Sequence, residues 1–146
     1  MLVRNSPFKL VQTPGVLVVL YEEFNHYRQI FSDGRAFPPE TNPSWFGYSI
    51  GKWEGDTFVA QTVGFNDQSW FDDPGHPHSE ELRVTERFRR LNFGRLEIQI
   101  TFDDAKAYTK PWSATIPFTL LPDTDLIESI CENERDHQHM VGAELK

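Results

Sequence analysis

One carboxylate on an otherwise apolar strand face is the residue of this sequence best suited to acid/base chemistry. Residues 82–90 alternate in polarity, so Glu86 shares its face with three apolar side chains, Leu82, Val84 and Phe88. Burial without a partner is costly for a carboxylate and raises its pKa, which suits a general acid or base. The alternative is a structural ion pair with an arginine from a neighbouring strand, such as Arg28.

His26 and Arg28 alternate on another predicted strand, residues 26–31. If this strand lies near Glu86, His26 is the proton-transfer partner, and Arg28 stabilises an anion or a developing carbonyl charge. A hydrogen-bonded or surface histidine is the alternative for His26. The predicted catalytic group is therefore Glu86, His26 and Arg28.

Four aromatic residues and one lysine are candidates for the walls of a ligand cavity: Trp53, Trp70, Tyr108, Lys110 and Trp112. Aromatic walls suit a flat or apolar ligand. For two of them a structural role is equally compatible with the sequence, because Trp112 can cap the core and Tyr108 can donate to a loop carbonyl. We expect a small apolar or aromatic molecule as partner, and no cofactor.

The loop at residues 66–79 contains two histidines separated by one residue. His76 and His78, with acidic residues nearby, are weak candidates for metal ligands, and no metal is predicted. A lid over the mouth of a barrel is the preferred role for this loop. The single cysteine, Cys131, excludes an intrachain disulfide and a multi-cysteine metal site. The sequence also lacks the G-x-S-x-G, P-loop, H-E-x-x-H and G-x-G-x-x-G motifs.

Alternating segments separated by turns must position these residues. They predict about nine strands, at 8–13, 16–22, 26–31, two within 45–66, 82–90, 95–102, 112–120 and 126–133. The most apolar strand, 16–22, is expected to be buried on both faces. The predicted fold class is all-β, an antiparallel up-and-down meander of eight to nine strands forming a lipocalin-like barrel. A two-layer β-sandwich is the alternative.

Glycine and proline add detail to this fold. Gly55 lies between two acidic residues and predicts a tight turn in the hairpin at 45–66. Gly47 and Gly51 share a face of its first strand and leave space for a bulky neighbour, a bend or a ligand. Pro117 cannot donate to a ladder and predicts an edge or a bulge.

Composition limits the classes of function. The 146 residues suffice for one domain, 1–146, with residues 134–146 as a polar C-terminal tail. A net charge of −8 argues against nucleic-acid binding, and the basic run at 83–90 is interpreted as a salt-bridged strand surface. No apolar run reaches the length of a membrane span, and the first residues lack a signal-peptide pattern. The chain is expected to be soluble.

Several sequence blocks together resemble a family of little-characterised bacterial proteins from environmental genomes. The blocks are residues 27–35, GKWEGDT at 51–57, VGFND at 63–67, PHSE at 77–80, TERFRR at 85–90 and YTKPW at 108–112. The resemblance implies no established reaction. Related chains tend to extend further at the N-terminus and are often exported, which implies a periplasmic or secreted location. The family carries an acidic residue where this chain has Gln61.

These observations support three hypotheses of function. The first is a small-molecule-binding barrel with cofactor-free acid/base activity of the isomerase, lyase or hydrolase type. The second is a non-catalytic ligand carrier with the same architecture. The third is an assembly module whose exposed aromatic residues form a homodimer interface.

Overall fold

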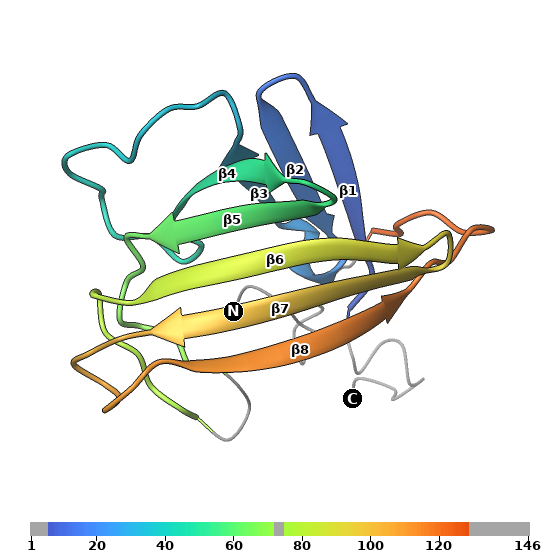
Figure 1. Ribbon diagram of the computed structural model, residues 1–146. Coiled ribbons are helices and arrows are strands. Elements are labelled where there is room, and N and C mark those ends of the chain that lie inside the picture. Colours follow the sequence, from blue (N-terminus) through green and yellow to red (C-terminus); the bar gives the residue numbers. More distant parts are fainter. Residues whose placement is uncertain (1–5, 72–74, 129–146) are drawn as a thin grey trace, which may run out of the picture.

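Eight strands form a single sheet in the computed structural model, which describes residues 6–71 and 75–128 (Figure 1). Strand order in the sheet equals strand order in the sequence. The elements are β1 (Phe8–Thr13), β2 (Val16–Tyr21), the short 3-10 helix η1 (Glu23–Asn25), β3 (Tyr27–Phe31), β4 (Tyr48–Glu54), β5 (Thr57–Val63), β6 (Arg83–Asn92), β7 (Arg95–Asp103) and β8 (Trp112–Thr119). The predicted all-β meander is therefore confirmed.

The sheet curls into a half-barrel, with β1 and β8 as its two edges (Figure 1). The rings of Phe8 on β1 and Phe118 on β8 meet edge to face, with centroids 4.9 Å apart. Aromatic side chains of the two edge strands thus contact each other, although no backbone ladder joins β1 to β8. Pro117 lies on an edge strand, as expected. A single sheet also excludes the two-layer sandwich among the described residues.

One pair of neighbouring strands is parallel, which the sequence did not predict. Ile30 of β3 pairs with Ser49 of β4 in parallel register, whereas all the other neighbouring strands are antiparallel. A long connection, residues 32–47, contains Pro38, Pro39 and Pro43 and returns the chain before β4 begins. Prolines lack the N–H that a ladder requires, so this segment crosses the molecule as a loop.

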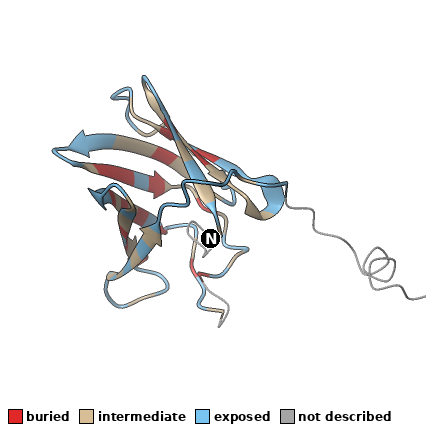
Figure 2. Cartoon of the chain, turned by 90° about the vertical axis from the view of Figure 1, so that its right-hand side faces the viewer, coloured by how far each residue is buried: buried red, intermediate tan, exposed pale blue. Residues whose placement is uncertain are grey.

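The predicted inner faces are confirmed in the long strands. Val84, Glu86 and Phe88 of β6 are buried, and so are Ile98 and Ile100 of β7. Buried residues lie along the strands of the curled sheet, while the connecting loops are mostly exposed (Figure 2).

The prediction that the second strand is buried on both faces is wrong. In β2, Leu17 and Val19 are buried, whereas Val16 and Val18 on the other face are only partly buried. The reason is architectural: a single curled sheet encloses its inner face, and no second layer covers the outer face in the described part of the chain.

The predicted ninth strand is not found where the structure describes it. Residues 126–128 are not in a strand, and residues 129–133 lie outside the described residues, as do Cys131 and the tail at 134–146. Before this point the chain contacts the opposite edge of the sheet. Lys9 of β1 forms an ion pair of 2.7 Å with Asp125, and the backbone N–H of Ile127 donates to Oε2 of Glu22 at 3.1 Å.

The glycines of the β4–β5 hairpin serve two purposes. Gly55 turns the chain with a φ of +63°, as expected. A Cβ at Gly51 would lie 2.5 Å from Cζ of Phe58 and 2.9 Å from Cγ2 of Ile30. The space above Gly51 is thus filled by bulky neighbours. The basic strand β6 is salt-bridged to the same hairpin, since Arg87 pairs with Glu54 at 2.9 Å.

Candidate functional site

Two strands that are distant in sequence bring Arg28 and Glu86 together inside the half-barrel. The guanidinium donates through Nη1 to Oε1 of Glu86 at 3.0 Å and through Nη2 to Oε2 at 2.5 Å. The residues are 3% and 0% exposed. Both carboxylate oxygens are therefore occupied by a bidentate fork, which is the structural ion pair that the sequence offered as an alternative to catalysis.

Three hydroxyl groups surround this pair: those of Ser49 and Thr62, which with Arg28 and Glu86 form what we call the buried ion-pair cluster, and that of Tyr21, which also hydrogen-bonds to Arg28. Nε of Arg28 donates to Oγ of Ser49 on β4 at 3.0 Å, and Nη2 donates to Oγ1 of Thr62 on β5 at 2.7 Å. Burial alone would lower the pKa of Arg28, but the charge and hydrogen bonds of Glu86 raise it overall. The cluster is a closed and satisfied polar network.

His26 does not join this cluster. Its side chain is exposed just before β3, where its ring meets Phe46 edge to face with centroids 5.4 Å apart. No hydrogen bond or ion pair joins His26 to Arg28 or Glu86. The structure therefore brings two members of the predicted catalytic group together and places the third at the surface.

An apolar pocket lies beside the cluster, between the inner face of β6–β8 and the described loop residues 69–71 and 78. Its volume is about 170 Å³. Two of the predicted wall residues, Trp70 and Trp112, line it. The other lining residues are Trp45, Phe65, Ser69, Phe71, His78, Leu82, Val84, Ile100, Phe102, Ala114 and Ile116. Glu86 is not among them.

The described part of the loop packs onto the strands through Phe71. This ring is buried, with its centroid 4.6 Å from that of Phe102 on β7 and 5.6 Å from that of Trp112 on β8. Trp70, by contrast, is largely exposed at the rim. Loop residues thus cover one end of the inner face, where a lid was expected.

The remaining predicted wall residues do not line this pocket. Tyr108 donates its hydroxyl to the carbonyl of Pro77 at 2.8 Å, which is the structural role considered for it. Lys110 is exposed. Trp53 is 52% exposed on β4 and packs on Phe58 with ring centroids 5.3 Å apart.

One polar atom in the pocket wall has no partner. Nε1 of Trp112 is buried and donates to no acceptor among the described residues. A buried donor without an acceptor costs about 1–3 kcal/mol, and such groups are rare in folded proteins. The atom is closed to solvent, so an acceptor on a bound molecule would satisfy this N–H only after a shift of the indole ring.

A second polar feature of the pocket was missed by sequence reasoning. Nε2 of His78 lies 2.8 Å from Oγ of Ser69, and Nδ1 lies 3.2 Å from the carbonyl oxygen of Ser79. A carbonyl oxygen can only accept, so Nδ1 carries the proton of the neutral ring. Nε2 is then the acceptor, and the hydroxyl of Ser69 donates to it.

Asp104, in the turn after β7, helps to position His78 indirectly, because it anchors Ser79, the next residue in the chain. Its carboxylate accepts four hydrogen bonds: from N–H and Oγ of Ser79 at 2.6 and 2.8 Å, and from the backbone N–H groups of Lys106 and Ala107, both at 3.1 Å. Burial alone would raise the pKa of Asp104, but these donors lower it overall. The carbonyl that orients His78 therefore belongs to a firmly anchored residue.

Antiparallel register explains why Ser69 and His78 meet. Trp70 forms an antiparallel bridge with Pro77, and the N–H of Phe71 donates to the carbonyl of His76 at 2.9 Å. Extended by one residue, from Trp70 to Ser69 and from Pro77 to His78, this antiparallel register places Ser69 opposite His78. The Pro74-Gly75 dipeptide is the sequence signal that would have suggested a turn between these two segments, although no turn was predicted there.

The two histidines of the loop have different environments. His76 is exposed, whereas His78 is 8% exposed and has both ring nitrogens in hydrogen bonds. Within residues 6–71 and 75–128, no three potential metal ligands gather. Asp72 and Asp73 lie outside the described residues.

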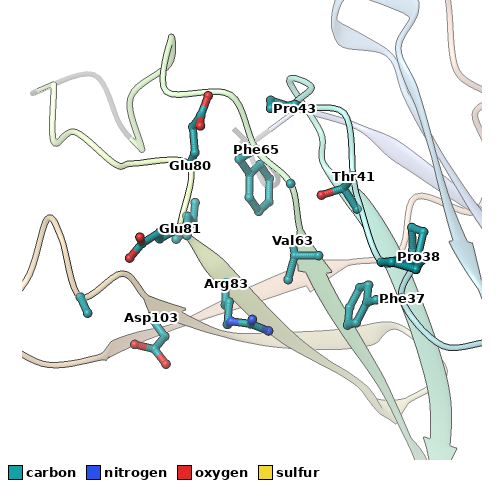
Figure 3. Close-up of a pocket in the computed structure, with 14 residues that line it drawn as sticks. Phe37, Pro38, Thr41, Pro43, Val63, Phe65, Glu80, Glu81, Arg83 and Asp103 are labelled. Atoms are coloured by element: carbon teal, nitrogen blue, oxygen red, sulfur yellow. The ribbon is translucent and has the colours of Figure 1, made fainter.

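A wider groove of about 630 Å³ lies on the other side of Phe65 and Leu82, which line both hollows (Figure 3). One wall is the proline-rich connection, with Phe37 and Pro38. The opposite wall carries charged side chains, namely Glu80, Glu81, Arg83 and Asp103. Such a surface does not suit the apolar ligand expected from the aromatic residues.

Comparison with known proteins adds no relative. No protein-family model, no curated protein and no solved structure matches the chain. The resemblance to bacterial proteins of environmental origin therefore stays a prediction, and the fold is known as a loosely lipocalin-like half-barrel. No helix in the described part of the chain has the length and apolar character needed to cross a membrane.

Proposed function

We propose that this protein binds a small apolar or aromatic molecule in the pocket between β6–β8 and loop residues 69–71 and 78. The observation that carries the proposal is the unpaired indole N–H of Trp112 in an aromatic-lined hollow. An apolar cavity of roughly 150 Å³ accommodates a benzene-sized molecule, so the pocket suits a single substituted ring. A hydrogen-bond acceptor on that ring would pair with Trp112 once the ligand shifts the indole, because its N–H is closed to solvent in the structure.

A binding function is better supported than catalysis in which Glu86 transfers the proton. Arg28 already occupies both oxygens of Glu86, and the carboxylate does not line the pocket. The catalytic role of Glu86, His26 and Arg28 and the homodimer remain predictions. An extracytoplasmic location, implied by the family resemblance, would agree with a carrier for small molecules.

A pair of isosteric ligands tests the proposal. Acetophenone carries a carbonyl acceptor, and α-methylstyrene has nearly the same shape without it. We expect acetophenone to shift the indole N–H resonance of Trp112 in ¹H–¹⁵N NMR spectra and to bind about tenfold more tightly than α-methylstyrene. The Trp112→Phe variant assigns the resonance and should abolish the preference.

The control lies at the other end of the half-barrel. Trp53→Phe removes an indole that does not line the pocket and should leave both affinities unchanged. If neither compound perturbs the Trp112 resonance at millimolar concentration, the pocket is not a binding site for molecules of this class.

A further inference from the structure

The pocket contains an arrangement that goes beyond binding. Ser69 and His78 both line it, joined by a hydrogen bond of 2.8 Å between Oγ and Nε2. The geometry assigns a proton on Nδ1, which donates to the carbonyl of Ser79, and leaves the lone pair of Nε2 to accept from the serine hydroxyl. A hydroxyl paired with a base that a third group orients is the general form of an activated nucleophile.

We propose that Ser69 and His78 form a nucleophile–base pair that hydrolyses small aryl or alkyl esters in the apolar pocket. This proposal rests on the binding function proposed above. The apolar walls from β6–β8 select the substrate, and the two catalytic residues come from the covering loop.

The first half of the reaction forms an acyl-enzyme. Oγ of Ser69 bonds to the ester carbonyl carbon while its proton moves to Nε2 of His78. The tetrahedral intermediate then collapses, the bond to the alkoxy or aryloxy oxygen breaks, and the leaving oxygen takes the proton from Nε2. An alcohol or phenol departs, and Ser69 remains acylated.

The second half consumes one water molecule. Nε2 of His78 takes a proton from the water as its oxygen attacks the acyl carbon. The bond from this carbon to Oγ breaks, Oγ recovers the proton from Nε2, and a carboxylic acid leaves. The net reaction is ester plus water to acid plus alcohol, with no cofactor.

Two surrounding groups support this assignment. Asp104 fixes Ser79 through its N–H and Oγ, at 2.6 and 2.8 Å, and so holds the carbonyl that sets the tautomer of His78. Asp104 is a positioning residue, since it does not contact the histidine ring directly. The second group is Trp112, which lines the same pocket; its buried N–H has no partner among the described residues and would reach a charged carbonyl oxygen after a shift of the indole ring.

Hydrolysis of phenyl acetate tests the proposal, with phenol release followed by absorbance. The purified chain should exceed its Ser69→Ala variant by about 10²-fold or more, the usual contribution of a positioned base and nucleophile. His78→Gln should lose activity to the same extent. Ser113→Ala, on the exposed face of β8, is the matched control and should keep full activity.

A fluorophosphonate probe gives a second readout, which does not require turnover. Peptide mapping should locate the phosphonyl group on Ser69, and labelling should disappear in His78→Gln while circular dichroism shows an intact fold. Labelling that is absent, or spread over several serines, would overturn the proposal.

Binding of acetophenone to Ser69→Ala separates this proposal from the one on which it rests. Bound acetophenone together with phenyl acetate hydrolysis that is insensitive to Ser69→Ala overturns the nucleophile–base pair and leaves the binding function intact. Absence of acetophenone binding in both the parent chain and the variant overturns both proposals.

Discussion

The inner face of the half-barrel carries two regions that differ in whether their polar groups are hydrogen-bonded. Across β3–β6, every partner in the buried ion-pair cluster is hydrogen-bonded, and Arg28 and Glu86 are sealed from solvent. Across β6–β8, beside the apolar pocket, the indole N–H of Trp112 has no acceptor in the described part of the chain. One strand, β6, belongs to both regions, since its Glu86 is part of the cluster and its Val84 lines the pocket.

This difference separates stability from function. A charged pair buried with all its partners is expensive to break, so it fixes the register of the strands that carry it. A hollow with an unsatisfied donor costs stability, and such a cost is typical of a ligand site. Glu86, the notable acidic residue of the sequence, thus belongs to the closed region, while the proposed nucleophile–base pair, Ser69 and His78, lies in the loop of the open region.

The largest expected effect comes from breaking the closed region. Glu86→Leu leaves the charge of Arg28 buried and unpaired, so we expect the free energy of unfolding to fall by about 3–5 kcal/mol. Arg28→Met with Glu86→Leu removes both charges and should recover most of the loss. Urea unfolding measures both.

The matched control is the exposed pair of Arg87 and Glu54. Arg87→Ala should change the urea midpoint little, because solvent screens this pair. An equal loss in Glu86→Leu and Arg87→Ala would mean that the cluster is not the main electrostatic support of the fold.

Asp104 links stability to the loop over the pocket. Asp104→Asn removes the charge that receives four hydrogen bonds, and we expect a loss of about 1.5–3 kcal/mol near neutral pH. The pKa of Asp104 is lowered in the folded state, so its stabilisation is present above its unfolded pKa of about 3.9 and fades as pH falls through the folded value.

The parent chain and Asp104→Asn should therefore converge in stability in acid. Unfolding followed by fluorescence from neutral pH down to about pH 3 measures this convergence. Asp125→Asn, which removes an exposed partner of Lys9, serves as control. A constant difference at all pH values would show that Asp104 acts through packing and not through its charge.

Strand-level features of this fold could be predicted from the sequence because they are local. Alternation at residues 82–90 identified the inner face of β6, and the single carboxylate among its apolar residues pointed to Glu86 and its partner Arg28. A desolvated charge requires an opposite charge wherever the fold places it. This requirement made the ion pair predictable without knowledge of the topology.

Features that depend on distant packing could not be predicted in the same way. The parallel pairing of β3 and β4 results from how the connection at 32–47 crosses the molecule, which alternation does not encode. Ser69 and His78 meet across the antiparallel bridge of Trp70 and Pro77, and Phe71 holds this pair over the pocket by packing against Phe102 and Trp112. Trp53 was grouped with the wall residues since aromatic type alone does not show at which end of the sheet a side chain lies.

The smallest expected effects come from enlarging one small residue in each region, which compares how tightly the two regions are packed. In the closed region, Gly51→Ala places a methyl group 2.5 Å from Phe58 and 2.9 Å from Ile30, too close for any contact without movement. We expect a loss of about 1–3 kcal/mol from overpacking. In the open region, Ala114→Leu adds three carbons to the pocket wall, where the hollow can accept them, so unfolding should change by less than about 1 kcal/mol.

We expect the two variants to rank the other way round in their effect on ligand affinity. Ala114→Leu fills the space that acetophenone would occupy and should weaken its binding about tenfold or more, whereas Gly51→Ala should leave the affinity unchanged in the folded fraction. Thermal unfolding and NMR titration of the same two variants provide both measurements. If Ala114→Leu is as destabilising as Gly51→Ala, the inner face of β6–β8 is packed as tightly as the cluster, and the distinction between a closed and an open region fails.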